Sequence, residues 1–156
     1  MTWEDLGTAV HELATQIQAD GFGPDAVLAL ARGGLPCAGA LAYALGVKSM
    51  ATLNVEFYTG VDERLEDPLV LPPVPDLSLL RAERLLVVDD VADTGRTLAL
   101  AREFCAQHVP EVRTAVLYEK PQSVVHSDFV WRRTDRWITF PWSVPVPAAL
   151  TSSGAS

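Results

Sequence analysis

One segment, residues 84–97, restricts the fold of this chain more than any other. It begins with an apolar run that becomes acidic at its carboxyl end (RLLVVDD, residues 84–90) and continues into a turn at residues 93–95. A helical pattern rich in leucine and alanine then runs through His108. A buried strand, a turn and a helix form the repeating unit of parallel α/β sheets, which bind ligands outside the carboxyl ends of their strands. The segment therefore predicts a fold class and the edge of the sheet where ligands bind.

Other segments repeat this pattern. Residues 25–31 are a short apolar run that ends near a glycine pair, and residues 36–45 are alanine-rich and open with proline, as helices often do. Residues 48–58 and 112–118 are rich in strand formers. Residues 3–20 carry apolar side chains at helical spacing, after a potential capping box. We therefore expect an α/β fold with a mostly parallel, twisted sheet flanked by helices.

Length and local composition predict how the chain is organised. Its 156 residues suit one domain, which we expect to span residues 1–150 and to be followed by a mobile tail at 151–156. Residues 58–76 are acidic and then proline-rich, which predicts a long flexible loop such as a lid or a binding loop. Three tryptophans within residues 128–142 predict a separate small hood, within a segment of roughly 120–145.

The charge balance and the apolar pattern exclude several classes of partner. The formal net charge is −8, from 20 acidic against 12 basic residues, and no basic face is indicated, so nucleic-acid binding is not expected. The longest apolar stretch, residues 35–47, is interrupted by proline and glycine and is shorter than the ~20 residues that cross a bilayer. With no membrane span, no signal peptide and two cysteines, Cys37 and Cys105, that form no metal-like cluster, we expect a cytoplasmic protein.

Three carboxylates, those of Asp89, Asp90 and Asp93, crowd the strand end and the turn after it. Their mutual repulsion is costly without a cation or a hydroxyl-rich ligand. Residues 93–97 can offer backbone N–H groups and two threonine hydroxyls at a helix N-terminus, a geometry that binds a terminal phosphate. Taken singly, each acid could be an ordinary strand-end or helix-capping residue. Together they indicate an anion site, although no Walker loop, dinucleotide glycine motif or hydrolase elbow is present.

The segment at residues 87–97 (VVDDVADTGRT) resembles the phosphoribosyl pyrophosphate (PRPP) motif of type I phosphoribosyltransferases. The aspartate directly before Thr-Gly, here Asp93, resembles the 6-oxopurine branch of that family. Three further segments follow in the family's order. Residues 31–34 (ARGG) resemble its pyrophosphate loop, residues 119–121 (EKP) resemble the segment that carries the purine-site lysine, and residues 137–142 (WITFPW) resemble the hood of xanthine-guanine phosphoribosyltransferases.

The resemblance implies an Mg²⁺-dependent enzyme that transfers 5-phosphoribosyl from PRPP to guanine, xanthine or hypoxanthine and releases pyrophosphate. Asp89 and Asp90 would hold the ribose hydroxyls, directly or through Mg²⁺. Asp93 would accept the proton from purine N7. The implied ribose- and phosphate-binding set is Asp89, Asp90, Asp93, Thr94, Gly95, Arg96 and Thr97.

The resemblance also implies how pyrophosphate is bound. Arg32, Gly33 and Gly34 would bind it, in a loop that in the family often contains a non-proline cis peptide. Arg64, in the long loop, is the candidate catalytic residue that closes over it. A solvated loop arginine is the alternative for Arg64, because its segment aligns only loosely with the family.

The purine site is implied by three residues. Lys120, a further catalytic candidate, would hydrogen-bond purine O6, Trp137 would stack on the base, and Ile138 would contact the purine 2-position. The alternatives are a solvated strand-end lysine for Lys120 and simple hydrophobic packing of the hood for Trp131, Trp137 and Trp142.

Two questions stay open at the level of the sequence. A PRPP-sensing regulatory module of the same fold, without turnover, is an alternative to the enzyme. Family members commonly form dimers or tetramers, and the alanine-rich helix after Gly34 could serve as the interface of a homo-oligomer.

Overall fold

The structure is a computed structural model that describes residues 1–56, 59–60, 63–64 and 68–144 of the chain. The expected tail at 151–156 and the end of the expected domain lie outside these residues. In chain order the elements are α1 (Trp3–Asp20), β1 (Ala26–Ala31), α2 (Gly34–Leu45), β2 (Ser49–Glu56), β3 (Thr59–Gly60), β4 (Glu63–Arg64), β5 (Leu69–Leu71), the 3-10 helix η1 (Leu77–Leu80), β6 (Arg84–Ala92), α3 (Arg96–Ala106), β7 (Glu111–Glu119), β8 (Phe129–Arg133) and the 3-10 helix η2 (Pro141–Ser143).

The main sheet has six strands in the order β5-β2-β1-β6-β7-β8. Neighbouring strands are parallel except for β2 and β5, which are antiparallel. From β1 the chain first extends the sheet on one side with β2, and later on the other side with β6, β7 and β8. The order therefore reverses between β1 and β6, which is where doubly wound α/β sheets open a ligand crevice. This architecture confirms the predicted α/β fold with a mostly parallel sheet.

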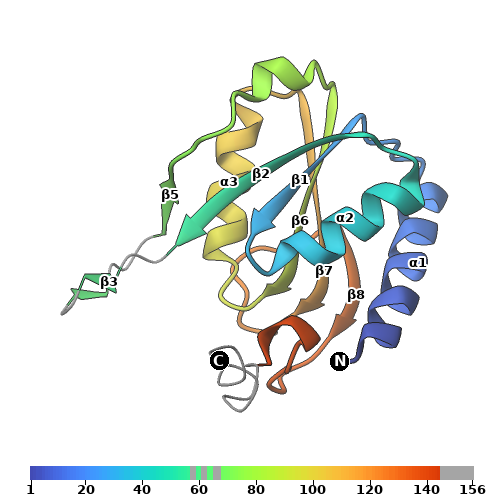
Figure 1. The fold of residues 1–156 in the computed structure, drawn as a ribbon, viewed down its shortest axis with the longest axis vertical. Coiled ribbons are helices and arrows are strands. Elements are labelled where there is room, and N and C mark those ends of the chain that lie inside the picture. Colours follow the sequence, from blue (N-terminus) through green and yellow to red (C-terminus); the bar gives the residue numbers. More distant parts are fainter. Residues whose placement is uncertain (57–58, 61–62, 65–67, 145–156) are drawn as a thin grey trace, which may run out of the picture.

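Helices cover both faces of this sheet. Figure 1 shows α1 and α2 on one face and α3 on the other, in agreement with the two hydrophobic cores. Successive residues of β1 point to opposite faces, so Val27 belongs to the core beneath α1 and α2, whereas Leu28 belongs to the core beneath α3. Because β1 is buried on both sides, its sequence is a continuous apolar run rather than an alternating one.

The predicted amphipathic helix at residues 3–20 is confirmed as α1. Its capping box forms as the sequence indicates: Asp5 N–H donates to Thr2 Oγ1 at 3.0 Å, and Thr2 N–H donates to Asp5 Oδ2 at 2.7 Å. The Trp131 indole N–H of β8 donates to Glu12 at 2.7 Å, which fixes α1 against the edge of the sheet.

The proline-rich segment at 58–76 contains more secondary structure than expected. Leu69–Leu71 form β5, which pairs with the end of β2 as an antiparallel edge strand. Thr59–Gly60 and Glu63–Arg64 form a separate two-stranded ribbon. An edge strand tolerates nearby prolines because one side of its backbone makes no sheet bonds. Part of the expected loop, residues 57–58, 61–62 and 65–67, lies outside the described residues.

The expected separate hood requires a correction. Residues 129–133, which fall inside the predicted hood, form β8, the outer parallel strand of the main sheet. Phe129 and Trp131 are buried in the core beneath α1 and α2, and this burial draws the strand into the sheet. The other described residues of the predicted hood, 120–128 and 134–144, precede and follow β8 in the chain. No helix in the described part of the chain combines the length and the apolar character needed to cross a membrane.

Candidate active site

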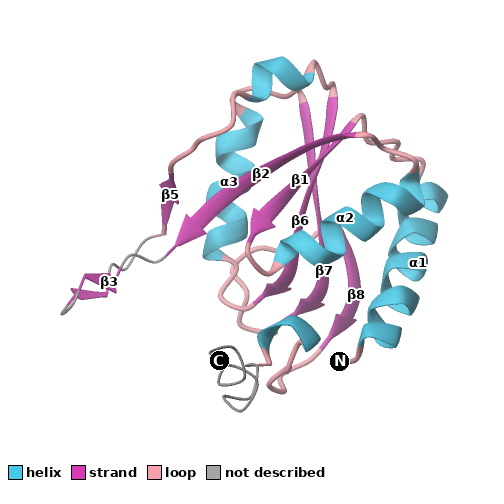
Figure 2. Ribbon diagram, viewed as in Figure 1, coloured by secondary structure: helices cyan, strands magenta, loops and turns pink. Residues whose placement is uncertain are grey.

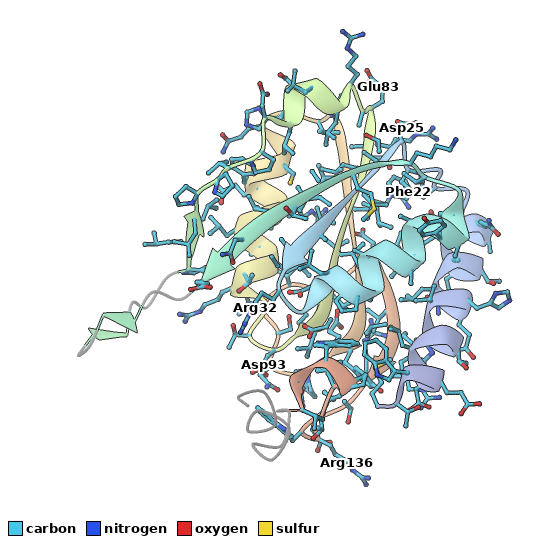
Figure 3. All side chains as sticks on the ribbon, in the orientation of Figure 1. Phe22, Asp25, Arg32, Glu83, Asp93 and Arg136 are labelled. Atoms are coloured by element: carbon cyan, nitrogen blue, oxygen red, sulfur yellow. The ribbon has the colours of Figure 1, made fainter. Side chains whose placement is uncertain are left out.

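The residues expected to bind the ligand gather at the carboxyl edge of the sheet. Figure 2 shows the arrowheads of β1, β6, β7 and β8 ending at this edge, where loops and η2 gather. In Figure 3, Arg32 and Asp93 lie at this end of the molecule, whereas Asp25 and Glu83 lie at the other. A cleft of about 1040 Å³ opens here, next to the reversal in strand order. Its lining includes Arg32, Gly33, Asp90, Phe140 and Trp142.

The turn between β1 and α2 passes very close to β6. It contains a cis peptide bond before Arg32, which is exposed beside the cleft. A Cβ at Gly33 would lie 2.3 Å from Oδ2 of Asp90, and a Cβ at Gly34 would lie 2.5 Å from the carbonyl oxygen of Val88. Both distances are well inside van der Waals contact. Only glycine therefore allows this turn to approach β6 so closely.

Asp89 and Asp90 form a crowded acidic pair at the end of β6. The Asp90 N–H donates to Oδ1 of Asp89 at 2.9 Å. Burial raises the pKa of Asp89 well above its ordinary value, and the charge of Asp90 raises it further. Burial also raises the pKa of Asp90, although hydrogen bonds, including one from the Trp142 side chain, oppose that shift. A cation or a hydroxyl-rich ligand beside the pair would relieve both effects.

This acidic pair fits a magnesium ion that is shared with a substrate. Among the residues that the structure describes, no group of three or more His, Cys, Asp or Glu side chains could hold a metal ion. Asp89 and Asp90 offer carboxylate oxygens, and Mg²⁺ is commonly held by one or two carboxylates together with substrate phosphates. The pair is therefore suited to a cation that a phosphorylated substrate helps to coordinate.

The turn between β6 and α3 presents a helix N-terminus to the same edge. Gly95 has a φ of 75°, in the left-handed region that favours glycine, and precedes the first residue of α3. Thr94 is exposed, and its Oγ1 accepts a long hydrogen bond of 3.5 Å from the Arg96 N–H. The N–H groups of a first helical turn lack intrahelical acceptors and can bind an anion. Residues 93–97 thus combine amide and hydroxyl donors.

Lys120 and the hood lie beside this turn. The Lys120 side chain is buried, and its Nζ donates to the carbonyl oxygen of Arg136 in the hood. It is therefore not a solvated strand-end lysine. Ile138 is half-buried and packs against the core beneath α1 and α2. Trp137 is 90% exposed, so it takes no part in hydrophobic packing of the hood and presents its ring to solvent.

Comparisons with known proteins identify the family to which this chain belongs. A family model described as the phosphoribosyl transferase domain matches residues 2–149. The chain belongs to the phosphoribosyltransferase family. This confirms the resemblance on which the sequence-based expectations rest.

Curated relatives and solved structures agree with this assignment. The xanthine-guanine phosphoribosyltransferase of Ruegeria sp. TM1040 is 31% identical over 155 residues, covering 92% of this chain and 84% of the relative. The corresponding protein of Roseobacter denitrificans is 33% identical, with the same coverage of 92% and 84%. A purine phosphoribosyltransferase from Pyrococcus horikoshii superposes with a TM-score of 0.80 and 37% identity, covering 94% of this chain and 95% of that one.

The structure of this phosphoribosyltransferase brings most of the predicted site residues to one edge of the sheet, with one exception. Arg32, Gly33 and Asp90 line the cleft, and Asp93 lies at the same end. Arg64 is in β4, opposite Thr59 in the two-stranded ribbon. Its side chain lies outside the part of the chain that the structure describes, so the proposed lid role stays a prediction.

Some residues at the edge of this phosphoribosyltransferase site were not predicted. The family resemblance implies Trp137 as the aromatic residue that stacks on the base. Phe140 and Trp142, however, line the cleft, with ring centroids 4.8 Å apart in a stacked pair. Their position on either side of Pro141 in the hood segment was the available signal. Gln122 donates to Asp93 Oδ1 at 2.7 Å, and nothing in the sequence marked it.

Proposed function

We propose that this phosphoribosyltransferase is an Mg²⁺-dependent enzyme that transfers 5-phosphoribosyl from PRPP to a 6-oxopurine, releasing pyrophosphate and a nucleoside monophosphate. The observation that carries the proposal is the acidic pair of Asp89 and Asp90 at the cleft, flanked by the glycine turn at 31–34 on one side and the turn at 93–97 on the other. Relatives named xanthine-guanine phosphoribosyltransferase support the choice of purine class.

In this proposal the acidic pair and the two turns each bind a different part of PRPP. Residues 93–97 bind the 5-phosphate through amide and hydroxyl donors. Asp89 and Asp90 hold the ribose hydroxyls, directly or together with Mg²⁺. When bound, Mg²⁺ neutralises part of the charge on the departing pyrophosphate. Arg32 and the amides of residues 33 and 34 bind the pyrophosphate, with Arg64 as the candidate that closes over it.

The reaction needs a proton acceptor and a purine-binding surface. A ring nitrogen of the base forms a bond to C1 of the ribose, the bond from C1 to the pyrophosphate oxygen breaks, and the proton on purine N7 moves to the Asp93 carboxylate. A well-placed general base of this kind typically contributes roughly 10²–10⁴ in rate. Lys120 donates to purine O6, Trp137 stacks on the ring and Ile138 contacts the 2-position. The buried setting of Lys120 next to the hood supports its assignment.

The test is incubation of the protein with PRPP, Mg²⁺ and each of guanine, xanthine, hypoxanthine and adenine, with detection of nucleotide and pyrophosphate. We expect product from at least one 6-oxopurine, because Lys120 can donate to an oxo group but cannot accept from an amino group. No product from any base, or product from adenine alone, contradicts the proposal.

The alternative from another class is a PRPP-binding regulatory module without turnover. The solved structure of a hypothetical protein from Neisseria gonorrhoeae with bound ppGpp, 25% identical with a TM-score of 0.78, covers 92% of this chain and 88% of that one. Because that protein binds ppGpp, its structure supports the idea that a chain with this fold binds a phosphorylated nucleotide. Binding of PRPP in calorimetry, without nucleotide formation from any base, favours the alternative.

We further propose that the enzyme is a homo-oligomer, a dimer or a tetramer, in the cytoplasm. α2 presents Leu35 and Tyr43 to solvent, the latter 92% exposed, although both are apolar enough to favour burial. Both cysteines are free and buried, which suits a reducing compartment. Light scattering on a size-exclusion column tests the assembly: we expect an oligomer at micromolar concentration and dissociation in Tyr43→Glu. A monomer contradicts this proposal.

A further inference from the structure

The turn after β7, residues 120–125, lies along the loop between β6 and α3. Three hydrogen bonds join this turn to Ala92, the last residue of β6, and to the next two residues along the chain. The bonds run from Lys120 N–H to the Ala92 carbonyl oxygen (3.0 Å), from Gln122 Nε2 to Asp93 Oδ1 (2.7 Å) and from Val124 N–H to the Thr94 carbonyl oxygen (2.9 Å).

The turn at 120–125 is also in close contact with Gly95. A Cβ at Gly95 would lie 2.3 Å from Oγ of Ser123. The turn itself is held by the Ser123 N–H, which donates to the Lys120 carbonyl oxygen at 3.0 Å, and by the Ser123 hydroxyl, which donates to the Val125 carbonyl oxygen at 2.7 Å. The backbone that carries Gln122 is therefore fixed relative to the β6–α3 loop.

Glu119 fixes both ends of this connection. Its side chain, only 3% exposed, accepts hydrogen bonds from the Ser127 N–H at 2.7 Å and from Arg133 Nε at 3.0 Å. A buried carboxylate with charged and backbone donors holds its surroundings firmly. These bonds hold the backbone between residue 127 and β8 in place. The turn that carries Gln122 is therefore fixed at both of its ends.

We infer that Gln122 is a positioning residue, which holds the Asp93 carboxylate in the orientation that accepts the purine proton. The inference rests on the proposed function. The Gln122 amide occupies Oδ1, which leaves Oδ2 of the same carboxylate as the second acceptor. An exposed carboxylate on a turn would otherwise sample several rotamers, whereas one amide donor selects the rotamer that presents Oδ2. Fixing the acceptor in this way lowers the entropic cost of the proton transfer.

The test measures single-turnover rates of nucleotide formation and PRPP dissociation constants for five forms of the protein. These are the wild type, Gln122→Ala, Asp93→Asn, the double variant, and Gln16→Ala as a matched control on the exposed face of α1. Because a misplacement of 1 Å can cost about 10²-fold, we expect Gln122→Ala to lower the rate by about 10-fold or more. Its PRPP dissociation constant stays within about twofold of wild type, because the phosphate donors of the loop are retained.

The double variant separates positioning from a structural effect. A residue that acts only through Asp93 has no further effect once Asp93 is replaced, so the double variant should match Asp93→Asn. A sixth form, Gln122→Glu, keeps the length of the side chain but removes the amide donor, and should lose rate as Gln122→Ala does. Gln16→Ala should match wild type throughout.

The outcomes distinguish this inference from the proposed function. A wild-type protein that makes no nucleotide from any 6-oxopurine overturns the proposed function and the inference with it. An active wild type with a slow Asp93→Asn and an unaffected Gln122→Ala overturns the inference alone. An equal loss from Gln122→Ala in the wild-type and Asp93→Asn backgrounds also overturns it, because Gln122 would then act independently of Asp93.

Discussion

The carboxylate of Asp90 occupies the space that a side chain at position 33 would need, since a Cβ on Gly33 would lie 2.3 Å from Asp90 Oδ2. We therefore expect Gly33→Ala to displace the Asp90 carboxylate or the turn, and to weaken PRPP binding by about 10-fold or more. Gly39→Ala is the matched control, because a Cβ there meets nothing within 4 Å. It should bind PRPP normally and gain roughly 0.5–1 kcal/mol of stability from helix propensity. Calorimetry with PRPP and Mg²⁺ measures both variants; equal affinities would contradict the close contact.

The acidic pair should reduce the stability of the protein in the absence of substrate. Burial raises the pKa of Asp89, as does the neighbouring charge of Asp90, so at neutral pH the ionised pair opposes folding. Asp89→Asn should therefore raise the unfolding temperature, by roughly 2–4 °C for each kcal/mol gained, while nucleotide formation is lost. Asp135→Asn, at an exposed position, is the control and should change neither property. An Asp89→Asn variant that is less stable than wild type at neutral pH would argue against repulsion within the pair.

Glu119 should make the stability depend on pH in the acid range. Burial alone would raise its pKa, but hydrogen bonds from the Ser127 N–H, Arg133 and His126 lower it below the ordinary value of 4.5. A lowered pKa means that the folded state holds the proton less tightly than the unfolded state. The stabilisation by Glu119 is then fully present above pH 4.5, the ordinary pKa that this carboxyl has in the unfolded chain, and is lost as the pH falls through the lower pKa of the folded state.

The comparison of wild type with Glu119→Gln isolates this contribution. The variant keeps the shape and one acceptor but loses the charge, so we expect wild type to be more stable by about 1–3 kcal/mol at pH 7. The difference should shrink as the pH falls below 4.5, the ordinary value for this carboxyl. Urea unfolding at a series of pH values measures it. A difference that stays constant from pH 7 to pH 3 would show that the ionisation of Glu119 is not involved.

The two thiols should be unreactive in the folded protein. Burial raises the pKa of Cys105 to about 12 and raises that of Cys37 well above its ordinary value. Because the thiolate is the reactive form, a thiol reagent at pH 8 should modify neither residue in the native state and both after unfolding. Mass spectrometry of the labelled protein measures this. Rapid labelling of Cys37 in the native state would mean that the turn before α2 opens readily.

The sequence predicted the secondary structure best where a local pattern of residues has only one structural explanation. The continuous apolar run of β1, the capping box at Thr2 and Asp5, and the change from apolar to acidic residues along β6 all led to correct elements, because burial and helix capping are encoded locally. The carboxyl edge of the sheet was predictable for the same reason: strand ends in a parallel sheet meet at one edge.

The edges of the sheet were less predictable. β5 has only three residues and lies among prolines, so its pairing with β2 decides its structure. In β8 the buried Phe129 and Trp131 alternate with more exposed residues. The segment is short and rich in tryptophan, so the sequence alone favours a hood over a sheet strand. The hydrogen bond between Gln122 and Asp93 joins side chains 29 residues apart in the sequence. It depends on how two turns pack together, which a local sequence pattern does not predict.

A crystal structure of the protein with ribose 5-phosphate and Mg²⁺ tests the central claim most directly. We expect the phosphate at residues 93–97, accepting hydrogen bonds from the backbone N–H groups at the start of α3, with the ribose hydroxyls next to Asp89 and Asp90. A phosphate bound at any other edge of the sheet, with the N–H groups of this turn directed away from it, would contradict the proposed PRPP site.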